Sequence, residues 1–259
     1  MKLTPKNYYS KAANLHYMSV SQFKAFEKCQ NSALAEVKGE YQQETTTAML
    51  VGSYCDACFE GTLDAFLKEN PDVAKKGGEL KAEFVHARDV IIPRIKRDKT
   101  FMKHMAGRKQ VIMTGEICGV PIKIKIDSYR PGKGIDDLKI VKDFEPIYVA
   151  EKGMLPWWQA WGYDLQGAVY QEIVRQNTGE KLPFFLDAAT KEKVPDIDVL
   201  HVSQDELDFA LERFKEDVEM YDAIKKGIIE PDRCGKCDWC KMSKVIHQPS
   251  ESSDYIFDV

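Results

Sequence analysis

The hydrophobic pattern changes its period close to residue 110, and this change limits the folds that the chain can adopt. Before that point apolar residues such as Phe23, Phe26 and Leu34 recur at helical spacing. After it, apolar and polar residues alternate strictly from Ile122 to Asp127, which is typical of a β-strand with one buried face. We therefore expect an N-terminal helical part followed by a sheet.

Turn and capping signals divide the chain into elements. Helices are predicted at about residues 20–37, 45–69 and 82–105, the last one interrupted near Pro93, and later at 157–178 and from about 204 to 221. Strands are predicted on both sides of Gly119 within residues 110–129, and at 135–141, 182–190 and 196–202. This order predicts an α/β fold with a mixed central sheet flanked by helices, and not the regular alternation of a Rossmann fold.

Composition and length narrow the class of protein. The chain has 259 residues, of which 44% are hydrophobic, so it can form one large domain or two small ones. It contains no run of eighteen apolar residues, and its first twenty residues lack the apolar core of a signal peptide. We therefore expect a soluble cytoplasmic protein without a membrane partner.

The strand at residues 134–140, GIDDLKI, carries three charges where an apolar run is expected. Side chains alternate along a strand, so Asp137 and Lys139 share one face and Asp136 points to the other. If the strands pair across the RPGKG turn, Asp127 and Asp137 meet at one end of the sheet. Carboxylates held this close repel each other unless a cation lies between them, and oxygen ligands suit Mg²⁺ or Mn²⁺. The alternative is a surface hairpin with solvated charges.

Two further segments offer groups that could contact a ligand. Tyr163, Gln166 and Tyr170 form one helical stripe, which is either the edge of the core or a surface for a phosphate or a base. Residues 94–109 hold seven cations, Arg94, Lys96 and Arg97 among them, against the single acid Asp98. Such a patch can bind the phosphates of DNA although the net charge is −4, or it can be a solvated helix face.

The cysteines predict a second site. Cys234, Cys237 and Cys240 are spaced like ligands of zinc or of an iron–sulfur cluster, and both groups usually take four protein ligands. Cys29 and His247 are candidates for the fourth ligand. The alternative is a set of inert thiols. The other three cysteines are interpreted as buried hydrophobes, namely Cys55, Cys58 and Cys118.

Several motifs occur in an order that resembles the PD-(D/E)XK nuclease superfamily. Glu116, Gly119 and Asp127 precede the Asp137-x-Lys139 motif, all on predicted strands. The segments GSYCDACFEGTLDAF, WGYDLQGAVYQEIV and RCGKCDWCK resemble further motifs of the phage-type, RecB/RecE-like exonucleases related in fold to lambda exonuclease. The resemblance extends from about Tyr8 to Val245. It implies a restriction-endonuclease-like core in a single nuclease domain over residues 1–259, with a helical part at about 18–105 and the cysteine cluster at 234–240.

The resemblance also implies roles for individual residues. Asp127, Asp137 and the Leu138 carbonyl match the metal ligands, Lys139 matches the motif lysine, and Gln166 and Tyr170 match the helix that faces the DNA. Glu116 matches an auxiliary acid that would also contact the metal. Asp56 stands where related nucleases often have a metal-binding histidine. The cysteine motif implies that Cys29 completes the set with Cys234, Cys237 and Cys240, and it favours a [4Fe–4S] cluster over Zn²⁺.

The implied function is a Mg²⁺- or Mn²⁺-dependent DNA exonuclease that acts on linear double-stranded DNA in phage or prophage recombination. A single-strand annealing recombination protein is the partner that this context implies, and assembly into an oligomer stays open. Two alternatives remain at this stage. One is an endonuclease or single-strand exonuclease of the same fold, and the other is a non-catalytic DNA-binding or recombination module.

Overall fold

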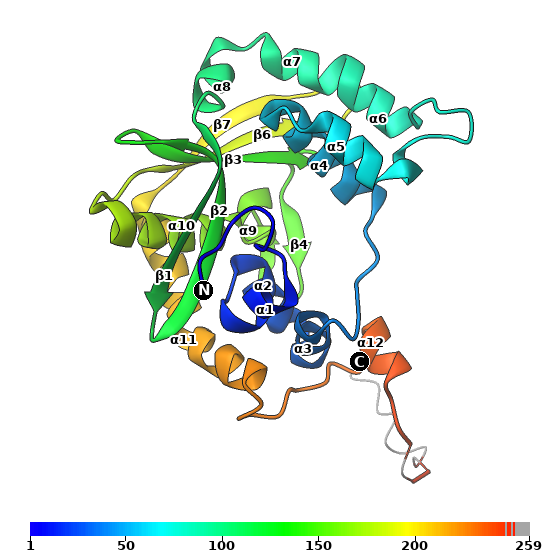
Figure 1. The fold of residues 1–259 in the computed structure, drawn as a ribbon, viewed down its shortest axis with the longest axis vertical. Coiled ribbons are helices and arrows are strands. Elements are labelled where there is room, and N and C mark those ends of the chain that lie inside the picture. The colour runs from blue at the N-terminus through cyan, green and yellow to red at the C-terminus, as the bar shows by residue number, and fades with distance from the viewer. Residues whose placement is uncertain (247, 250, 252–259) are drawn as a thin grey trace.

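The structure is a computed structural model that describes all residues except 247, 250 and 252–259. Its centre is a five-stranded mixed sheet with the strand order β1-β2-β3-β6-β7 (Figure 1). The strands are antiparallel to their neighbours except for β3 and β6, which run parallel. Their bounds are β1 Arg108–Ile117, β2 Val120–Arg130, β3 Gly134–Val141, β6 Phe184–Thr190 and β7 Ile197–Val202. The five predicted strands and the mixed sheet are thus confirmed.

Two short strands were not predicted. They are β4 Ile147–Val149 and β5 Gly153–Leu155, which form a separate hairpin. Its turn contains Glu151 at φ +68°, and Gly153 at φ +78° begins the second strand. Each strand is only three residues long, which is too short for an alternating pattern to stand out in the sequence.

The helices of the first hundred residues are shorter than predicted. The expected helix at 20–37 is two helices, α2 Val20–Lys28 and α3 Gln30–Lys38, because Cys29 adopts an extended conformation between them. The expected helix at 45–69 is α4 Thr47–Glu60 and α5 Leu63–Glu69, separated by Gly61 in the left-handed region. A short helix at the N-terminus, α1 Lys11–His16, precedes them.

The region around Pro93 is helical but irregular. It consists of α6 Ala82–His86, a π-helical turn at Ala87–Ile91, α7 Ile92–Lys96 and α8 Lys99–His104. Proline has no amide hydrogen to donate, so the helical hydrogen-bond pattern is disturbed in the turn before it. The interruption predicted near Pro93 is therefore confirmed.

The segment predicted as one helix at residues 157–178 forms two helices separated by Gly162 at φ +62°, and the helix predicted from about residue 204 is confirmed. The three helices are α9 Trp157–Ala160, α10 Tyr163–Thr178 and α11 Gln204–Lys225. Gly179 ends α10 at φ +78°, and Ser203 and Glu206 form a capping box at the start of α11. The short helix α12 Asp238–Met242 carries the last cysteine of the cluster.

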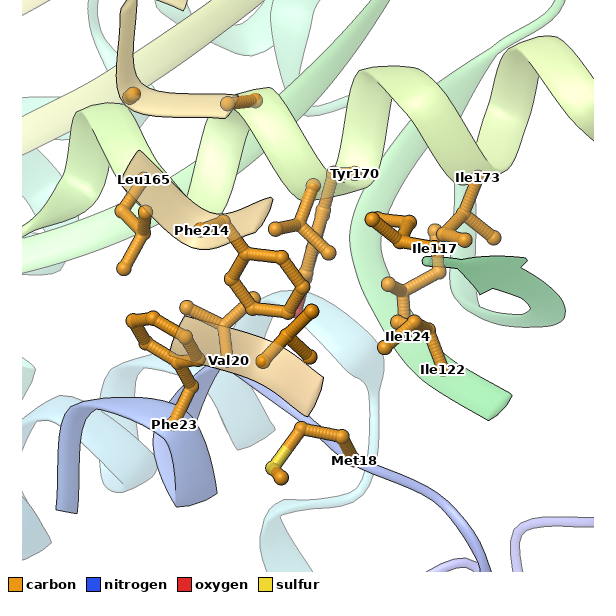
Figure 2. Close-up of a cluster of buried hydrophobic side chains, with 14 of the residues drawn as sticks. Met18, Val20, Phe23, Ile117, Ile122, Ile124, Leu165, Tyr170, Ile173 and Phe214 are labelled. Carbon is orange, nitrogen blue, oxygen red and sulfur yellow. The ribbon is translucent and has the colours of Figure 1, made fainter. Parts of the chain in front are cut away.

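Separate apolar cores cover the sheet on its two sides. One packs α2, α3, α10 and α11 against Ile122, Ile124 and Ile126, whose side chains are fully buried. Figure 2 shows part of this core, with Phe23 of α2 and Phe214 of α11 stacked at 4.4 Å between ring centroids. The other core packs α4 and α6–α8 against Leu138 and Ala189. The central strands β3 and β6 contribute to both cores, so they join the two halves of the molecule.

The turn between β1 and β2 corrects the expectation that Cys118 is buried. Cys118 and Gly119 both have positive φ, at +49° and +72°, as a tight two-residue hairpin requires. Cys118 is exposed there, and Cys58 is only half-buried, so of the three cysteines expected to be buried hydrophobes only Cys55 is fully buried.

Within the described residues, no helix is long and apolar enough to cross a membrane.

Candidate functional site

The β2–β3 hairpin brings Asp127 and Asp137 together as the alternation predicted. Ser128 pairs with Asp136 across this hairpin, so the preceding and following residues, Asp127 and Asp137, face each other. The Leu138 amide donates a hydrogen bond to Asp127 Oδ2 at 3.2 Å. Both acids line a cleft of about 520 Å³ between the sheet, α4 and the N-terminal segment.

Asp137 is held from two sides. Its Oδ1 accepts a hydrogen bond from Gln166 Nε2 at 2.7 Å, and its Oδ2 forms an ion pair with Lys139. Lys139 Nζ also lies 4.9 Å from the centre of the Tyr163 ring. Burial alone would lower the pKa of Lys139, but the carboxylates of Asp137 and Asp127 raise it above its ordinary value. The lysine is therefore a permanent cation beside the acids.

Asp127 is an acid that needs a cation or a proton. Burial raises its pKa well above the ordinary value, and the neighbouring carboxylates of Asp137 and Asp56 raise it further. Its partners among the described residues are weak neutral donors, the Leu138 amide and Gln110 Nε2 at 3.3 Å. A divalent ion bound between Asp127 and Asp137 would replace the proton.

Helix α4 places two more acids in the cleft. Burial, together with the charges of Asp137 and Glu60, raises the pKa of Asp56 to about 7, against the lowering effect of Lys139. Asp56 thus lies where the family resemblance predicted an additional ligand. Glu60 lies one turn later on the same helix face, and burial raises its pKa as well. Glu60 was not predicted from the sequence, although its spacing of four residues from Asp56 was a usable signal.

Gln110, which was also not predicted from the sequence, lies beside Asp127. Its register places it opposite Asp127 in the β1–β2 hairpin, between the pairs Lys109–Ser128 and Val111–Ile126. Its side-chain amide donates to Glu60 Oε1 and to Asp127, while its Oε1 is buried and accepts no hydrogen bond from the described residues. Its φ of +52° is uncommon for a residue with a side chain, and such strain is concentrated at functional sites.

Glu116 does not belong to this group, which corrects the prediction that it is an auxiliary acid and metal ligand. It pairs with Pro121 at the turn end of the β1–β2 hairpin, six positions along β2 from Asp127. At about 3.3 Å per residue, that separates it from Asp127 by about 20 Å. Its backbone is bound by the Gln176 side chain of α10, and its side chain is exposed. Sequence order placed it near Asp127, but an antiparallel hairpin brings Gln110 there instead.

The stripe on α10 divides between the two alternatives, because Tyr163 packs against the apolar core and the other two residues reach the cleft. Gln166 and Tyr170 both line it. Tyr170 donates a hydrogen bond to the Lys125 carbonyl at 3.1 Å, and burial raises the pKa of its hydroxyl well above the ordinary value. The hydroxyl therefore stays protonated beside the acids.

The cations of the cleft are not those of the predicted basic stretch. Arg94, Lys96 and Arg97 lie on α7 and just after it, and none of them lines the cleft. The apolar face of α7, with Ile92 and Ile95, packs into the core instead. The lysines that line the cleft are Lys24, Lys123, Lys125 and Lys139.

The opposite face of β3 holds a separate polar cluster. Arg130 donates two hydrogen bonds to Asp136, at 2.6 and 2.7 Å, and His104 Nδ1 lies 2.7 Å from the same carboxylate. Asp187 of β6 lies beside them, fully buried, and its oxygens accept no hydrogen bond from the described residues. Burial and the charge of Asp136 raise the pKa of Asp187 to about 9. Asp136 therefore points away from the cleft, as the alternation predicted.

The four predicted cysteines converge although about two hundred residues separate the first from the others. Cys29 Sγ lies 3.5 Å from Cys240 Sγ and 3.8 Å from Cys237 Sγ, and Cys234 Sγ lies 4.0 Å from Cys240 Sγ. Ligands on a tetrahedron with bonds of about 2.3 Å are about 3.8 Å apart. The donor set and its spacing thus fit a single tetrahedral ion. The other proposed ligand, His247, lies outside the described residues.

Comparison with known proteins agrees with this fold. None of the curated proteins matches the sequence. The crystal structure of a protein from Eubacterium rectale, described as a "putative exonuclease", has 47% sequence identity and a TM-score of 0.96, and the match covers 100% of both chains. The fold is therefore the restriction-endonuclease-like, mixed α/β core that was predicted. The model of the family described as "PDDEXK-like domain of unknown function (DUF3799)" matches residues 19–243, so the chain belongs to this PDDEXK-like family.

Proposed function

We propose that this protein is a metal-dependent nuclease that hydrolyses phosphodiester bonds of DNA and acts as an exonuclease on linear double-stranded DNA. The observation that carries the proposal is the pair of half-buried Asp127 and buried Asp137 beside the cation Lys139 in an open cleft. Membership of a PDDEXK-like family and the likeness to the Eubacterium rectale protein support it.

The residues of the cleft fit a divalent ion. Asp56, Asp127 and Asp137 bring three negative charges, and Lys139 returns one positive charge. Mg²⁺ or Mn²⁺ would balance the remainder, held by these three acids and the Leu138 carbonyl. When bound, the ion would polarise the scissile phosphate and lower the pKa of a water molecule. Asp56 can bind this ion or a second one. Metal titration distinguishes the two arrangements by the number of ions bound.

The protein's own side chains then have separate tasks. Lys139 keeps its proton because the acids raise its pKa, so it stabilises negative charge that develops on the phosphate instead of acting as a base. Gln166 orients Asp137 through the 2.7 Å hydrogen bond. Gln110 of β1 donates to Asp127, and Glu60 of α4 accepts a hydrogen bond from the same Gln110 amide and so helps to orient it. We place Tyr170 beside the bound strand because the residue lines the cleft.

We propose that the cysteine cluster holds one structural Zn²⁺ that ties the α2–α3 junction to α12. The sulfur spacing supports a single ion, because a four-iron cluster is larger and would require the thiolates to move apart. Metal analysis of anaerobically purified protein separates the two groups. One equivalent of zinc is expected, and a brown protein with iron and sulfide would favour the [4Fe–4S] cluster instead. Cys29→Ser should lower the melting temperature in either case.

The whole chain is proposed to act as one nuclease unit, because β3 and β6 contribute side chains to both apolar cores. A role in phage or prophage recombination with a single-strand annealing protein is supported only by the resemblance of the motif order. The intact acids and lysine speak against a non-catalytic DNA-binding module.

Digestion of three DNA substrates tests the activity. End-labelled linear duplex, closed circular duplex and single strands are incubated with the protein in Mg²⁺ and, as a control, in EDTA. We expect the linear duplex to be degraded from its ends and the circle to survive. Cleavage of the circle would instead indicate an endonuclease, and a lack of cleavage in every substrate would leave the DNA-binding module.

A further inference from the structure

The N-terminal segment forms a fixed wall of the cleft. Lys123 donates hydrogen bonds to the Tyr8 carbonyl at 2.5 Å and to Asn14 Oδ1 at 2.7 Å. The Met18 amide bonds to the Pro121 carbonyl, so the segment is joined to the start of β2, beside which the N-terminus lies (Figure 1). Residues before α1 are therefore placed by the catalytic sheet itself.

An exposed aromatic ring projects from this wall. Tyr9 lines the cleft with 68% of its surface exposed, whereas its neighbour Tyr8 is buried. The two rings meet edge to face at 4.9 Å, so Tyr8 supports Tyr9 from the protein side. An exposed ring on a supported backbone can receive another flat ring at low entropic cost.

A cation accompanies this ring on the strand that carries the metal acids. Lys125 Nζ lies 4.9 Å from the centre of the Tyr9 ring and 5.8 Å from that of Tyr8. Lys125 and Asp127 are two residues apart on β2 and line the same cleft, which separates them by about 7 Å along the strand. The strand position of a cation that contacts an exposed ring thus lies about one extended nucleotide from the position of Asp127.

We propose that Tyr9 and Lys125 form a subsite for an unpaired nucleotide next to the scissile phosphate, with Tyr9 stacking on the base and Lys125 contacting the phosphate. Asp137 is only 1% exposed at the floor of the cleft, so the strand must leave its duplex partner before its phosphate reaches the metal ligands. Stacking on an aromatic ring accepts every base, as a nuclease without sequence preference requires. The inference rests on the proposed function and narrows its substrate to a single-stranded or frayed end.

Binding of a labelled oligothymidylate tests the subsite. Fluorescence anisotropy is measured in Ca²⁺ in place of Mg²⁺, with a gel to verify that the oligonucleotide stays intact. Tyr9→Ala removes the stacking ring and should weaken binding by at least about 10-fold, which corresponds to about 1.4 kcal/mol. Tyr9→Phe keeps the ring and should bind like the wild type. The matched control is Tyr148→Ala, which removes a tyrosine of similar exposure, 72%, from the β4–β5 hairpin outside the cleft.

Abasic oligonucleotides separate stacking from a general loss of affinity. Moving one abasic position along the strand should reveal one place at which Tyr9→Ala and the wild type bind equally, because no base is left to stack. On a duplex capped by hairpins at both ends, Tyr9→Ala should have no effect. Equal binding of Tyr9→Ala and the wild type to the intact oligonucleotide would overturn the subsite. The subsite would also be overturned if Tyr9→Ala bound more weakly than the wild type by the same factor wherever the abasic position lies.

The two proposals fail in different ways. Wild-type protein that binds the oligonucleotide through Tyr9 but cleaves no DNA in Mg²⁺ would refute the nuclease and keep the subsite. Wild-type protein that cleaves DNA, and whose Tyr9→Ala variant binds and cleaves equally well, would refute the subsite and keep the nuclease.

Discussion

The two faces of β3 give adjacent aspartates opposite surroundings. Asp136 is neutralised by protein groups, with two hydrogen bonds from Arg130 and a close contact to His104. Asp137, one residue later, lies with Asp127 and Asp56 in a cleft where Lys139 is the nearest cation. Both aspartates are buried, so burial alone does not distinguish the proposed metal ligand Asp137 from the structural acid Asp136. The difference lies in whether the neighbouring side chains supply enough positive charge to balance the carboxylates, as Arg130 does for Asp136.

The largest effect is expected on the cleft face. Asp137→Asn should reduce DNA cleavage in Mg²⁺ at least about 1000-fold, since it removes a metal ligand and the partner of Lys139. The protein should stay folded, because the change also removes repulsion between Asp137 and Asp127. Initial rates on end-labelled DNA and a thermal melt of the same preparation check both parts. Near wild-type cleavage by this variant would show that Asp137 is not a metal ligand.

The opposite face should affect stability instead. Arg130→Met leaves Asp136 without its cation in a fully buried position, which should lower the free energy of unfolding by about 3 kcal/mol. Urea denaturation measures the change. Lys142→Met is the control, because it breaks the exposed pair with Asp143 and should leave the denaturation midpoint almost unchanged. If the two variants unfold alike, the cluster behind β3 has no structural role.

This contrast also shows how far the sequence alone leads. The alternation along β2 and β3 predicted the sheet, the meeting of Asp127 with Asp137 and the opposite direction of Asp136, because a strand fixes its own faces. It did not predict Gln110 or Glu60, whose positions depend on the hairpin register and on how α4 packs against β3. The placement of Glu116 was wrong for the same reason. The convergence of Cys29 with the C-terminal cysteines was implied by family resemblance and not by spacing.

A smaller effect is expected from pH. The pKa of Asp187 is raised from an ordinary value near 4 to about 9. Between these pH values the folded protein keeps a proton on Asp187, whereas the unfolded chain has already released it. The free energy of unfolding should therefore fall as pH rises from about 4 toward about 9, because only the folded protein keeps this proton in that window. Asp187→Asn, which cannot ionise, should flatten that fall. An unchanged pH profile would mean that Asp187 is already ionised and compensated in the folded protein.

The smallest effect is expected from the basic stretch outside the cleft. Reversing the charge of Arg94, Lys96 and Arg97 by substitution with Glu should weaken DNA binding and flatten its salt dependence. The slope of the logarithm of the binding constant against the logarithm of the salt concentration should shrink by about 0.9 for each phosphate contact that is lost. Because these side chains do not line the cleft, the cleavage rate at saturating DNA should hardly change. Binding titrations at several salt concentrations provide the measurement. A slope equal to that of the wild type would identify the stretch as an ordinary solvated surface.

Binding of Mn²⁺ tests the central claim most directly, because it needs neither DNA nor turnover. The free ion is followed by electron paramagnetic resonance as it is titrated into the wild type, Asp137→Asn and Asp187→Asn, which alter the two faces of the same sheet. We predict that the wild type and Asp187→Asn bind Mn²⁺ with similar affinity and that Asp137→Asn loses this binding. Equal binding by all three proteins, or a loss confined to Asp187→Asn, would contradict the assignment of the metal to the Asp127–Asp137 cleft.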